Sequence, residues 1–342
     1  IRHVRVRRGV PVGGQGDDNI GGNPHHHIII DHCSTSWGMD ENISLYRHMR
    51  PSLDGKTQIK DPAEHITIQW TISSEALDAK GHAFGGTWGG NPSTFHHNLF
   101  ASNTARNPSI GMSGPFDYRY NVIYNWRHRT MDGGDETSMV NVINNYYKPG
   151  PATNDNIRDV FARIEERSMY SPGSAWAEGG WYTKEANRPG KWYVAGNVMH
   201  GNAEVTADNW NGGVQLENFP EAQTKEFLAA IKQPKPFSMP KFNIMSAEEA
   251  YDFVLTNVGA TIPKRDAVDE RILKQVKTGK IEVKDGLENA IGKEYIKRRL
   301  PADSYKKGII THPDQVGGYP TYKGKAYKDS DNDGIPDAGE KK

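Results

Sequence analysis

The sequence predicts an all-β protein whose short strands form a parallel β-helix, a solenoid in which each coil adds strands to continuous sheets. Two recurrences favour this fold. Short apolar strands, each followed by a polar turn, begin about every 20 to 40 residues. Asn recurs at comparable places within them. The composition agrees, because only 35% of the residues are apolar while 36 Gly and 20 Pro favour many turns.

The predicted strands are the apolar segments that set this spacing. They lie at residues 27–31, 65–70, 94–100, 120–126, 139–147 and 192–199. Three of them contain the recurring asparagines, which are Asn98, Asn121 and the group of Asn141, Asn144 and Asn145. Stacked Asn side chains can bond one another and the backbone at the corners of a solenoid. The alternative is a β-sandwich, but the Asn-Gly turns typical of tight hairpins are scarce.

From about residue 214 the pattern changes from strands to helices. Ser246 and Glu249 form a capping box ahead of apolar residues at helical spacing, and Asp266 can cap a second helix that ends at Gly279. We therefore expect a β-helix over 1–213, a helical extension over 214–300 and an extended tail over 301–342. The chain opens inside a strand-like segment, so we expect the first coils of the β-helix to be missing.

Charge and cysteine content argue against several classes of protein. Lys+Arg and Asp+Glu number 42 each, so no net positive field favours nucleic acid. No run of 18 apolar residues is present, which argues against a membrane-spanning helix. The single cysteine, Cys33, precludes an intrachain disulfide. We expect a monomer that neither binds nucleic acid nor inserts into membranes.

An acidic stretch near the C-terminus has the spacing of a calcium-binding loop. Gly334 stands at relative position 6, where such a loop turns sharply, and carboxylates stand at positions 1, 3, 5, 9 and 12. These are Asp329, Asp331, Asp333, Asp337 and Glu340. Pro336 and the lack of flanking helices favour a loop like those of thrombospondin type 3 or dockerin repeats over an EF-hand. The alternative is an acidic tail that binds no metal.

Acids on either side of the first apolar strand form a second candidate calcium site. Asp17 and Asp18 precede the strand at 27–31, and Asp40 and Glu41 follow it. Because the turns of successive coils stack, carboxylates that are distant in sequence can share one cation there.

Four ordered motifs resemble polysaccharide lyase family 1, the pectate lyases. They are HIIIDHCSTSWGMDE, HITIQWTISSEAL, FHHNLFASNTARNP and YNVIYNW, and the similarity runs from about Arg2 to Trp210. The C-terminal helices and the acidic loop resemble bacterial members built of several parts. The resemblance implies a right-handed, single-stranded parallel β-helix that cleaves polygalacturonate, the pectin backbone, with calcium. It also implies a secreted protein, extracellular, periplasmic or at the cell surface.

The resemblance further implies roles for individual residues. Arg106, followed by Asn107 and Pro108, occupies the place of the catalytic base, and Lys80 that of a lysine that contacts the substrate carboxylate. Asp18 and Asp40 occupy the places of calcium ligands, and Asp17 and Glu41 are adjacent alternatives.

One departure concerns substrate binding. The family often has a second arginine where this chain has Gly111, so Arg119 or Arg127 is a candidate to supply the charge. His82, Arg119 and Trp181 are the candidates for substrate contact.

Two other functions stay open. A β-helical glycoside hydrolase acting on pectin would use Asp17 and Asp18 as an acid and a base without a metal, which leaves Arg106 without a role. A non-catalytic glycan-binding β-helix would stack sugars on the aromatic residues Trp176, Trp181 and Tyr182. Only a lyase yields an unsaturated product that absorbs ultraviolet light.

Overall fold

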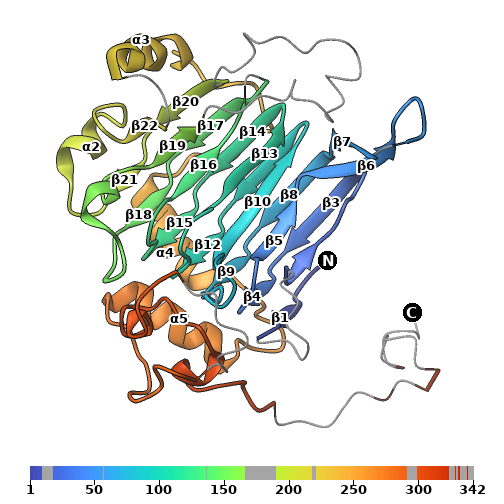
Figure 1. Ribbon diagram of the computed structural model, residues 1–342, viewed down its shortest axis with the longest axis vertical. Helices are drawn as coiled ribbons and strands as arrows, with labels where there is room; N and C mark the ends of the chain where they lie inside the picture. The colour runs from blue at the N-terminus through green and yellow to red at the C-terminus, as the bar shows by residue number, and fades with distance from the viewer. Residues whose placement is uncertain are drawn as a thin grey trace.

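The computed structural model describes residues 1–9, 18–56, 58–135, 137–165, 190–217, 221–290, 299–322, 328, 330, 331 and 337. Within these residues the chain is mostly β, with parallel sheets and few helices (Figure 1). None of the helices in this part of the chain has the length and apolar character needed to cross a bilayer.

Each pass of the chain adds strands to three parallel sheets. Sheet 1 has the order β1 (Arg5–Arg7), β4 (Ser34–Ser36), β9 (Ile72–Ser74), β12 (Leu99–Ala101), β15 (Val122–Tyr124), β18 (Tyr146–Lys148) and β21 (Val198–Met199). Sheet 2 has β2 (Ile20–Gly21), β5 (Glu41–Leu45), β10 (Phe84–Gly90), β13 (Ser109–Ser113), β16 (Met131–Gly133), β19 (Ala162–Glu165) and β22 (Val214–Glu217). Sheet 3 has β3 (His26–Asp31), β8 (Glu64–Gln69), β11 (Ser93–His96), β14 (Pro115–Arg119), β17 (Met139–Ile143) and β20 (Lys191–Ala195).

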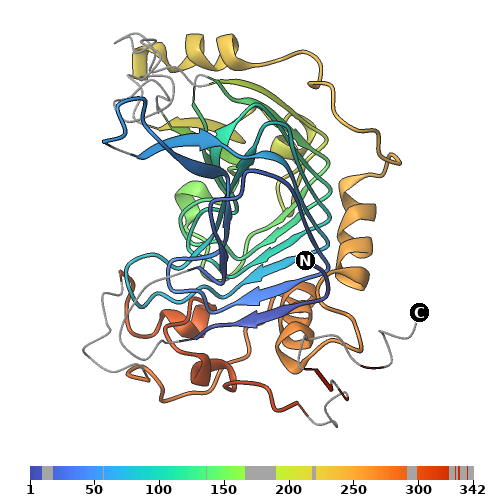
Figure 2. The same cartoon turned by 90° about the vertical axis from the view of Figure 1, so that its right-hand side faces the viewer.

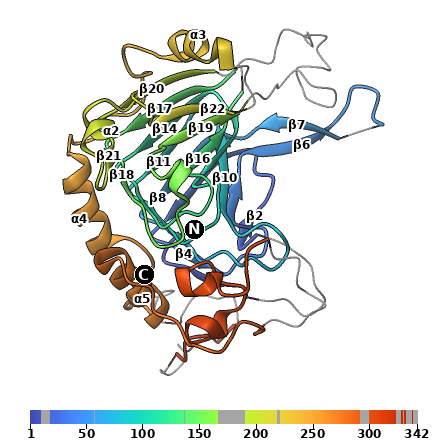
Figure 3. The same cartoon turned by 60° about the vertical axis from the view of Figure 1, so that its left-hand side comes forward.

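Strands that neighbour each other in a sheet come from successive passes, and Figure 2 shows them stacked one above another. Their inward side chains fill a common apolar core, in which Trp88, Phe95 and Phe116 are almost completely buried. This arrangement is consistent with the predicted parallel β-helix. An antiparallel hairpin, β6 (Arg47–Pro51) with β7 (Gln58–Pro62), interrupts it between β5 and β8 and projects from the sheets (Figure 3).

Buried asparagines line the corner between sheets 3 and 1. The side-chain amide nitrogen of each donates to the side-chain oxygen of the next one in the series, with N···O distances of 2.9 to 3.0 Å. The series is Asn98, Asn121, Asn145, Asn197 and Asn209. The predicted stacking is thus confirmed for Asn98, Asn121 and Asn145. The side chains of Asn141 and Asn144 instead donate to the carbonyl oxygens of Phe237 and Met245.

The same corner divides several predicted strands. Those at 94–100, 139–147 and 192–199 each form two strands in different sheets, because the chain bends at His97, Asn144 and Gly196. These residues have φ of 56°, 51° and 70°, in the left-handed region. Apolar residues stand on both sides of each corner because they face the same interior, so each pair of strands was predicted as one. The bends themselves are marked by His97-Asn98, Asn144-Asn145 and Gly196-Asn197.

Two helices form where the sequence predicts them, with the predicted caps. α4 (Ala247–Asn257) begins with the Ser246–Glu249 capping box, and α5 (Ala267–Thr278) begins after Asp266 and ends at Gly279, whose φ is 71°. α4 contacts β15 and β18 of sheet 1, and α3 (Glu221–Ile231) contacts β20 and β22 at the last pass (Figure 1). α2 (Ala203–Ala207) follows β21, and η1 (Asp155–Ile157) is a 3-10 helix before β19.

Part of the segment predicted as an extended tail contains two 3-10 helices, η3 (Ser304–Lys307) and η4 (Pro313–Val316). Tyr305 and Ile310 are fully buried there, in an apolar cluster with Trp37 and Ile272. The C-terminal residues therefore pack against the first passes of the sheets, and hydrophobic burial holds them in place.

Ion pairs attach α5 to the first passes of the sheets. Arg7 Nη2 lies 2.6 Å from the Asp269 carboxylate, and Arg271 Nη1 lies 2.6 Å from the Glu75 carboxylate. Both carboxylate side chains are at most 1% exposed. Because removing one partner from such a pair leaves a buried charge uncompensated, these contacts hold α5 against the sheets.

We expect the free energy of unfolding to fall as the pH decreases from about 6.5 toward 4, through His96 and His97. Their rings are buried, with Nδ1 atoms 2.7 Å apart. Burial lowers the pKa of His96 to about 3 and that of His97 to about 4. The unfolded chain takes up these protons near its ordinary pKa while the folded chain does not, so each site costs about 2 kcal/mol at pH 5.

Urea unfolding of the wild type and of His97→Gln between pH 7 and pH 5 measures this effect. The variant should lose less stability over that interval, whereas His27→Gln, at an exposed site, should follow the wild type. Equal pH slopes for the wild type and His97→Gln would mean that another group controls the decline.

Candidate functional site

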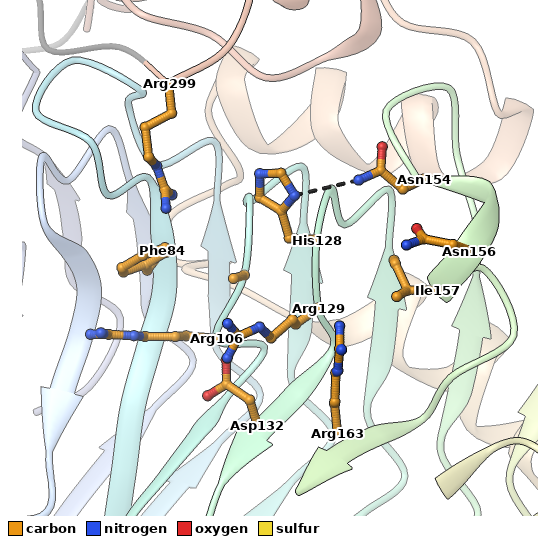
Figure 4. A pocket seen from close by; sticks show the side chains of 11 residues that line it. Phe84, Arg106, His128, Arg129, Asp132, Asn154, Asn156, Ile157, Arg163 and Arg299 are labelled. Atoms are coloured by element: carbon orange, nitrogen blue, oxygen red, sulfur yellow. Dashed lines mark hydrogen bonds and ion pairs between the residues drawn. The ribbon is translucent and has the colours of Figure 1, made fainter. Parts of the chain in front are cut away.

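A cavity of about 450 Å³ crosses successive passes near the starts of the strands of sheet 2. One wall begins at Phe84 of β10 and Arg106 in the turn before β13. The opposite end is formed by Ile157 of η1 and Arg163 of β19. Figure 4 shows the lining side chains, with Arg299 entering from the C-terminal segment, residues 299–322. A polymer that occupies this cavity would therefore lie across the strands rather than along one of them.

The local backbone holds Arg106 in a left-handed conformation, with φ of 55°. Gly86 N–H donates to the Arg106 carbonyl oxygen at 2.8 Å, and a Cβ at Gly85 would stand only 2.5 Å from that oxygen. Glycine at position 85 thus permits the close approach of β10 to the turn. The Arg106 guanidinium packs over Phe84, 4.2 Å from the ring centre, and donates through Nη1 to Glu41.

The pair with Glu41 sets the ionisation of Arg106 in this arrangement. Burial by itself would lower the pKa of Arg106, but the attraction and hydrogen bond of Glu41 outweigh it and raise the pKa above its usual value. The Glu41 side chain is 6% exposed and also accepts from Thr87 Oγ1 at 2.7 Å. Arg106 is thus protonated here and fixed in position.

A second chain of hydrogen-bonded amides connects the turns at this site. Each amide nitrogen donates to the next oxygen at 2.9 to 3.3 Å, through Asn19, Asn42, Asn103 and Asn107. Three of these asparagines directly follow a predicted site residue, in the pairs Asp18-Asn19, Glu41-Asn42 and Arg106-Asn107. The hydrogen bonds between these asparagines thus hold the turns that contain Asp18, Glu41 and Arg106 next to one another.

Three carboxylates gather beside Arg106. Asp18 Oδ1 accepts from the backbone N–H of Glu41 at 3.0 Å, and Asp40 Oδ1 lies 3.6 Å from His82 Nδ1. Burial, with repulsion from Glu41 and Asp40, raises the pKa of Asp18 to about 7. Because the neighbouring carboxylates add to the effect of burial on this pKa, a cation bound among these oxygens would be stabilised.

The donor set fits calcium in part. Calcium takes roughly 6 to 8 oxygen ligands, and Asp18 and Asp40 provide carboxylate oxygens of the required kind. Glu41 is engaged by Arg106 and Thr87, and Asp17 lies outside the described residues. Across residues 18–56 and the rest of the described chain, no group of three or more His, Cys, Asp or Glu side chains is arranged to hold a metal. Further ligands would have to come from water, a bound anion or residues outside the described part.

Other predicted site residues lie elsewhere. Lys80 is half-buried in the turn between β9 and β10 and does not line the cavity. Arg119 ends β14 in sheet 3, where it pairs with Asp117 at 2.5 Å and packs over Phe242. Trp181 lies outside the described residues.

At Gly111, where pectate lyases often have a second arginine, the ring of Tyr46 occupies the space. A Cβ at Gly111 would stand 2.5 Å from the Tyr46 ring, so the absence of a side chain there leaves room for Tyr46. Arg47 packs over the same ring, 4.6 Å from its centre. Arg127, the other residue considered for this charge, donates to the Ala152 carbonyl oxygen at 3.1 Å and does not line the cavity.

Sequence reasoning missed the other arginines of the cavity. Arg129 stands in the turn before β16, one pass after Arg106, and Arg163 lies on the following strand, β19. The recurrence of arginine shortly before β13 and β16 was the available signal for Arg129, whereas Arg163 lies within its strand and has no such signal. Arg299 has no such signal, because only the packing of the C-terminal segment brings it here.

The acidic loop at the C-terminus is only partly described. Asp329, Asp333 and Glu340 lie outside the described residues, while Asp331 and Asp337 lie within them. The Asp337 carboxylate accepts from the N–H and the hydroxyl of Ser330, at 2.7 and 2.9 Å. A structural calcium at this loop stays a prediction.

No protein-family model matches the chain. The chain is similar over its whole length to fungal proteins named probable pectate lyase C. The protein of this name from Aspergillus terreus is 31% identical over 345 residues, which cover 99% of this chain and 64% of that protein. That from Aspergillus fumigatus is 28% identical over 347 residues, covering 100% and 64%. That from Emericella nidulans is 27% identical over 341 residues, covering 98% and 62%.

The chain therefore spans a little less than two thirds of the length of these relatives. The similarity supports the predicted resemblance to pectate lyases. These relatives are fungal, so the expected likeness to bacterial members has no support from them.

Proposed function

We propose that the chain is a pectate lyase, which cleaves polygalacturonate by calcium-assisted β-elimination with Arg106 as the base. The observation behind this proposal is the position of Arg106 at one end of an arginine-lined cavity, beside the acidic group of Asp18, Asp40 and Glu41. The similarity to probable pectate lyase C over the whole chain supports the same reaction.

β-Elimination removes the proton from the sugar carbon that bears the carboxylate. The base takes that proton, and the electron pair of the C–H bond forms a double bond to the neighbouring carbon. The glycosidic oxygen leaves with the electrons of its bond to that carbon and takes up a proton from water. The proton is weakly acidic because the adjacent carboxylate is already negative, so positive charge around this carboxylate lowers the barrier. A cavity lined by several guanidinium groups offers such an environment.

Arg106 must give up a proton before it can accept one. Its guanidinium is protonated while Glu41 accepts from it, so we propose that the reactive state is one in which this ion pair is weakened. Alkaline pH favours that state. Phe84, which packs against the guanidinium, fixes its plane and limits its access to water.

Asp18 and Asp40 would hold the calcium, which when bound supplies positive charge next to the substrate carboxylate. Lys80 is proposed to contact that carboxylate once substrate is bound, since it lies in the turn directly before β10. His82, 3.6 Å from Asp40, is proposed to contact the sugar or to orient Asp40.

We also propose the wider properties that the resemblance implies. They are a right-handed β-helix with a helical extension and a tail, a structural calcium at the acidic loop, a monomeric state, and secretion to the extracellular space, periplasm or cell surface. The substrate would be the polyuronate of pectin.

The decisive experiment incubates the chain with polygalacturonate in calcium and follows ultraviolet absorbance together with reducing ends. A lyase raises both in proportion, because every cleavage creates one unsaturated sugar end. Reducing ends without new absorbance would indicate a glycoside hydrolase. Binding of polygalacturonate without either product would indicate a glycan-binding protein.

A further inference from the structure

The cavity beside Arg106 has more positive than negative side chains in its lining. Four arginines and one aspartate line it, namely Arg106, Arg129, Arg163, Arg299 and Asp132. Arg129 and Arg163 share Glu217, at 3.2 and 3.7 Å from its carboxylate. His128 adds no positive charge near neutral pH, because burial and nearby arginines lower its pKa to about 4. Arg106 pairs with Glu41 and Arg129 also pairs with Asp132, so the positive charge in excess among the described residues is that of Arg299, which indicates an anionic ligand.

Arg299 differs from the other three arginines in how it is held. The backbone N–H groups of Arg299 and Leu300 donate to the Asp78 carboxylate at 3.2 and 3.0 Å. Among the described residues, the guanidinium donates through Nη2 alone, to the carbonyl oxygen of His82 at 2.7 Å and more weakly to Thr104. No carboxylate in the described part of the chain forms an ion pair with it. Its backbone is thus anchored, while most of its N–H donors are left for another acceptor.

The position of this guanidinium places it next to the reaction. Arg299 packs over the Phe84 ring, 5.0 Å from its centre, and Arg106 packs over the same ring at 4.2 Å. Figure 4 shows Arg299 and Arg163 extending into the cavity from opposite sides, with Arg129 between them. Burial and the nearby positive charges of Arg106 and Arg129 lower the pKa of Arg299 despite the attraction of Asp78. An anion between these groups would relieve that repulsion.

We propose that Arg299, with Arg129, binds the carboxylate of a uronate residue that neighbours the one attacked by Arg106. This inference rests on the proposed function. The cavity spans several passes that lie about 4.8 Å apart, so a polyuronate across them presents successive carboxylates to successive turns. The C-terminal segment thereby completes the substrate site and selects for unesterified substrate.

The experiment compares Arg299→Gln with the wild type on pectins of increasing methyl esterification, in saturating calcium. We expect KM for polygalacturonate to rise about tenfold, because a charge-assisted hydrogen bond to a carboxylate is lost, with kcat nearly unchanged. The increase in KM should shrink as esterification removes the carboxylates. The KM of Arg299→Lys, which keeps the charge but not the planar donors, should lie between those of the wild type and Arg299→Gln. Lys306→Gln removes a positive charge from the same segment, outside the cavity, and should match the wild type.

Three outcomes would overturn the inference. Unchanged KM in Arg299→Gln, with an active wild type, would remove Arg299 from the substrate site and leave the proposed function intact. An equal loss at every degree of esterification, with a lower Tm, would mean that Arg299 only fastens the segment to Phe84 and His82. A wild type that forms no unsaturated product would overturn the proposed function and this inference with it.

Discussion

Arg106→Lys is expected to lower kcat on polygalacturonate by about 10²–10⁴-fold, the range in which a general base contributes to catalysis. Lysine retains the positive charge, but its ammonium has neither the planar face that packs on Phe84 nor the forked donors that reach Glu41. The base would then be displaced from the proton it must remove. The substitution should not unfold the chain, because the side chain is about a third exposed.

Steady-state kinetics by ultraviolet absorbance, together with thermal unfolding, measure the effect. Arg265→Lys is the matched control, because Arg265 bonds the carbonyl oxygens of Thr256 and Val258 away from the cavity. Its kcat should equal that of the wild type. If Arg106→Lys turns over like the wild type while the product is still unsaturated, the reaction is a β-elimination that uses another base.

The fold shows which structural features a sequence pattern determines. Capping residues are local, so Ser246, Asp266 and Gly279 marked the ends of α4 and α5 correctly. Corners are less visible, because apolar residues flank His97 and Asn144 on both sides and only a short polar interruption marks each bend. The stacked asparagines were predictable, since a buried amide in such a repeat has its equivalents above and below as partners.

The site was predictable where its residues stand in short motifs. Glu41 accepts from Arg106 and its backbone N–H donates to Asp18, and the adjacent asparagines bond across the passes. The roles that the resemblance implies for these residues stay predictions. Arg299 was not predictable, because its position depends on contacts with Asp78 and Phe84, more than 200 residues earlier in the chain. Tyr46, which fills the space at Gly111, likewise depends on the unpredicted hairpin that follows it.

Removal of calcium is expected to abolish cleavage reversibly, and Asp18→Asn should raise the calcium concentration for half-maximal activity by roughly 10- to 100-fold. Asparagine keeps an oxygen that can accept from the Glu41 N–H, so the local structure should persist while the negative charge is lost. Calcium affinity depends on the number of charged ligands, and the described residues provide few of them. Loss of one should therefore have a large effect.

Titration of activity with calcium after chelation measures this requirement and separates the site from the acidic C-terminal loop. Asp337→Asn alters that loop and should change the Tm in calcium more than the half-maximal concentration for activity. Asp252→Asn, at an exposed position on α4, controls for the change in net charge. Full activity in chelator would remove calcium from the mechanism. An unchanged calcium requirement in Asp18→Asn would instead move the catalytic calcium away from Asp18, because a direct carboxylate ligand cannot be neutralised without weakening the bound cation.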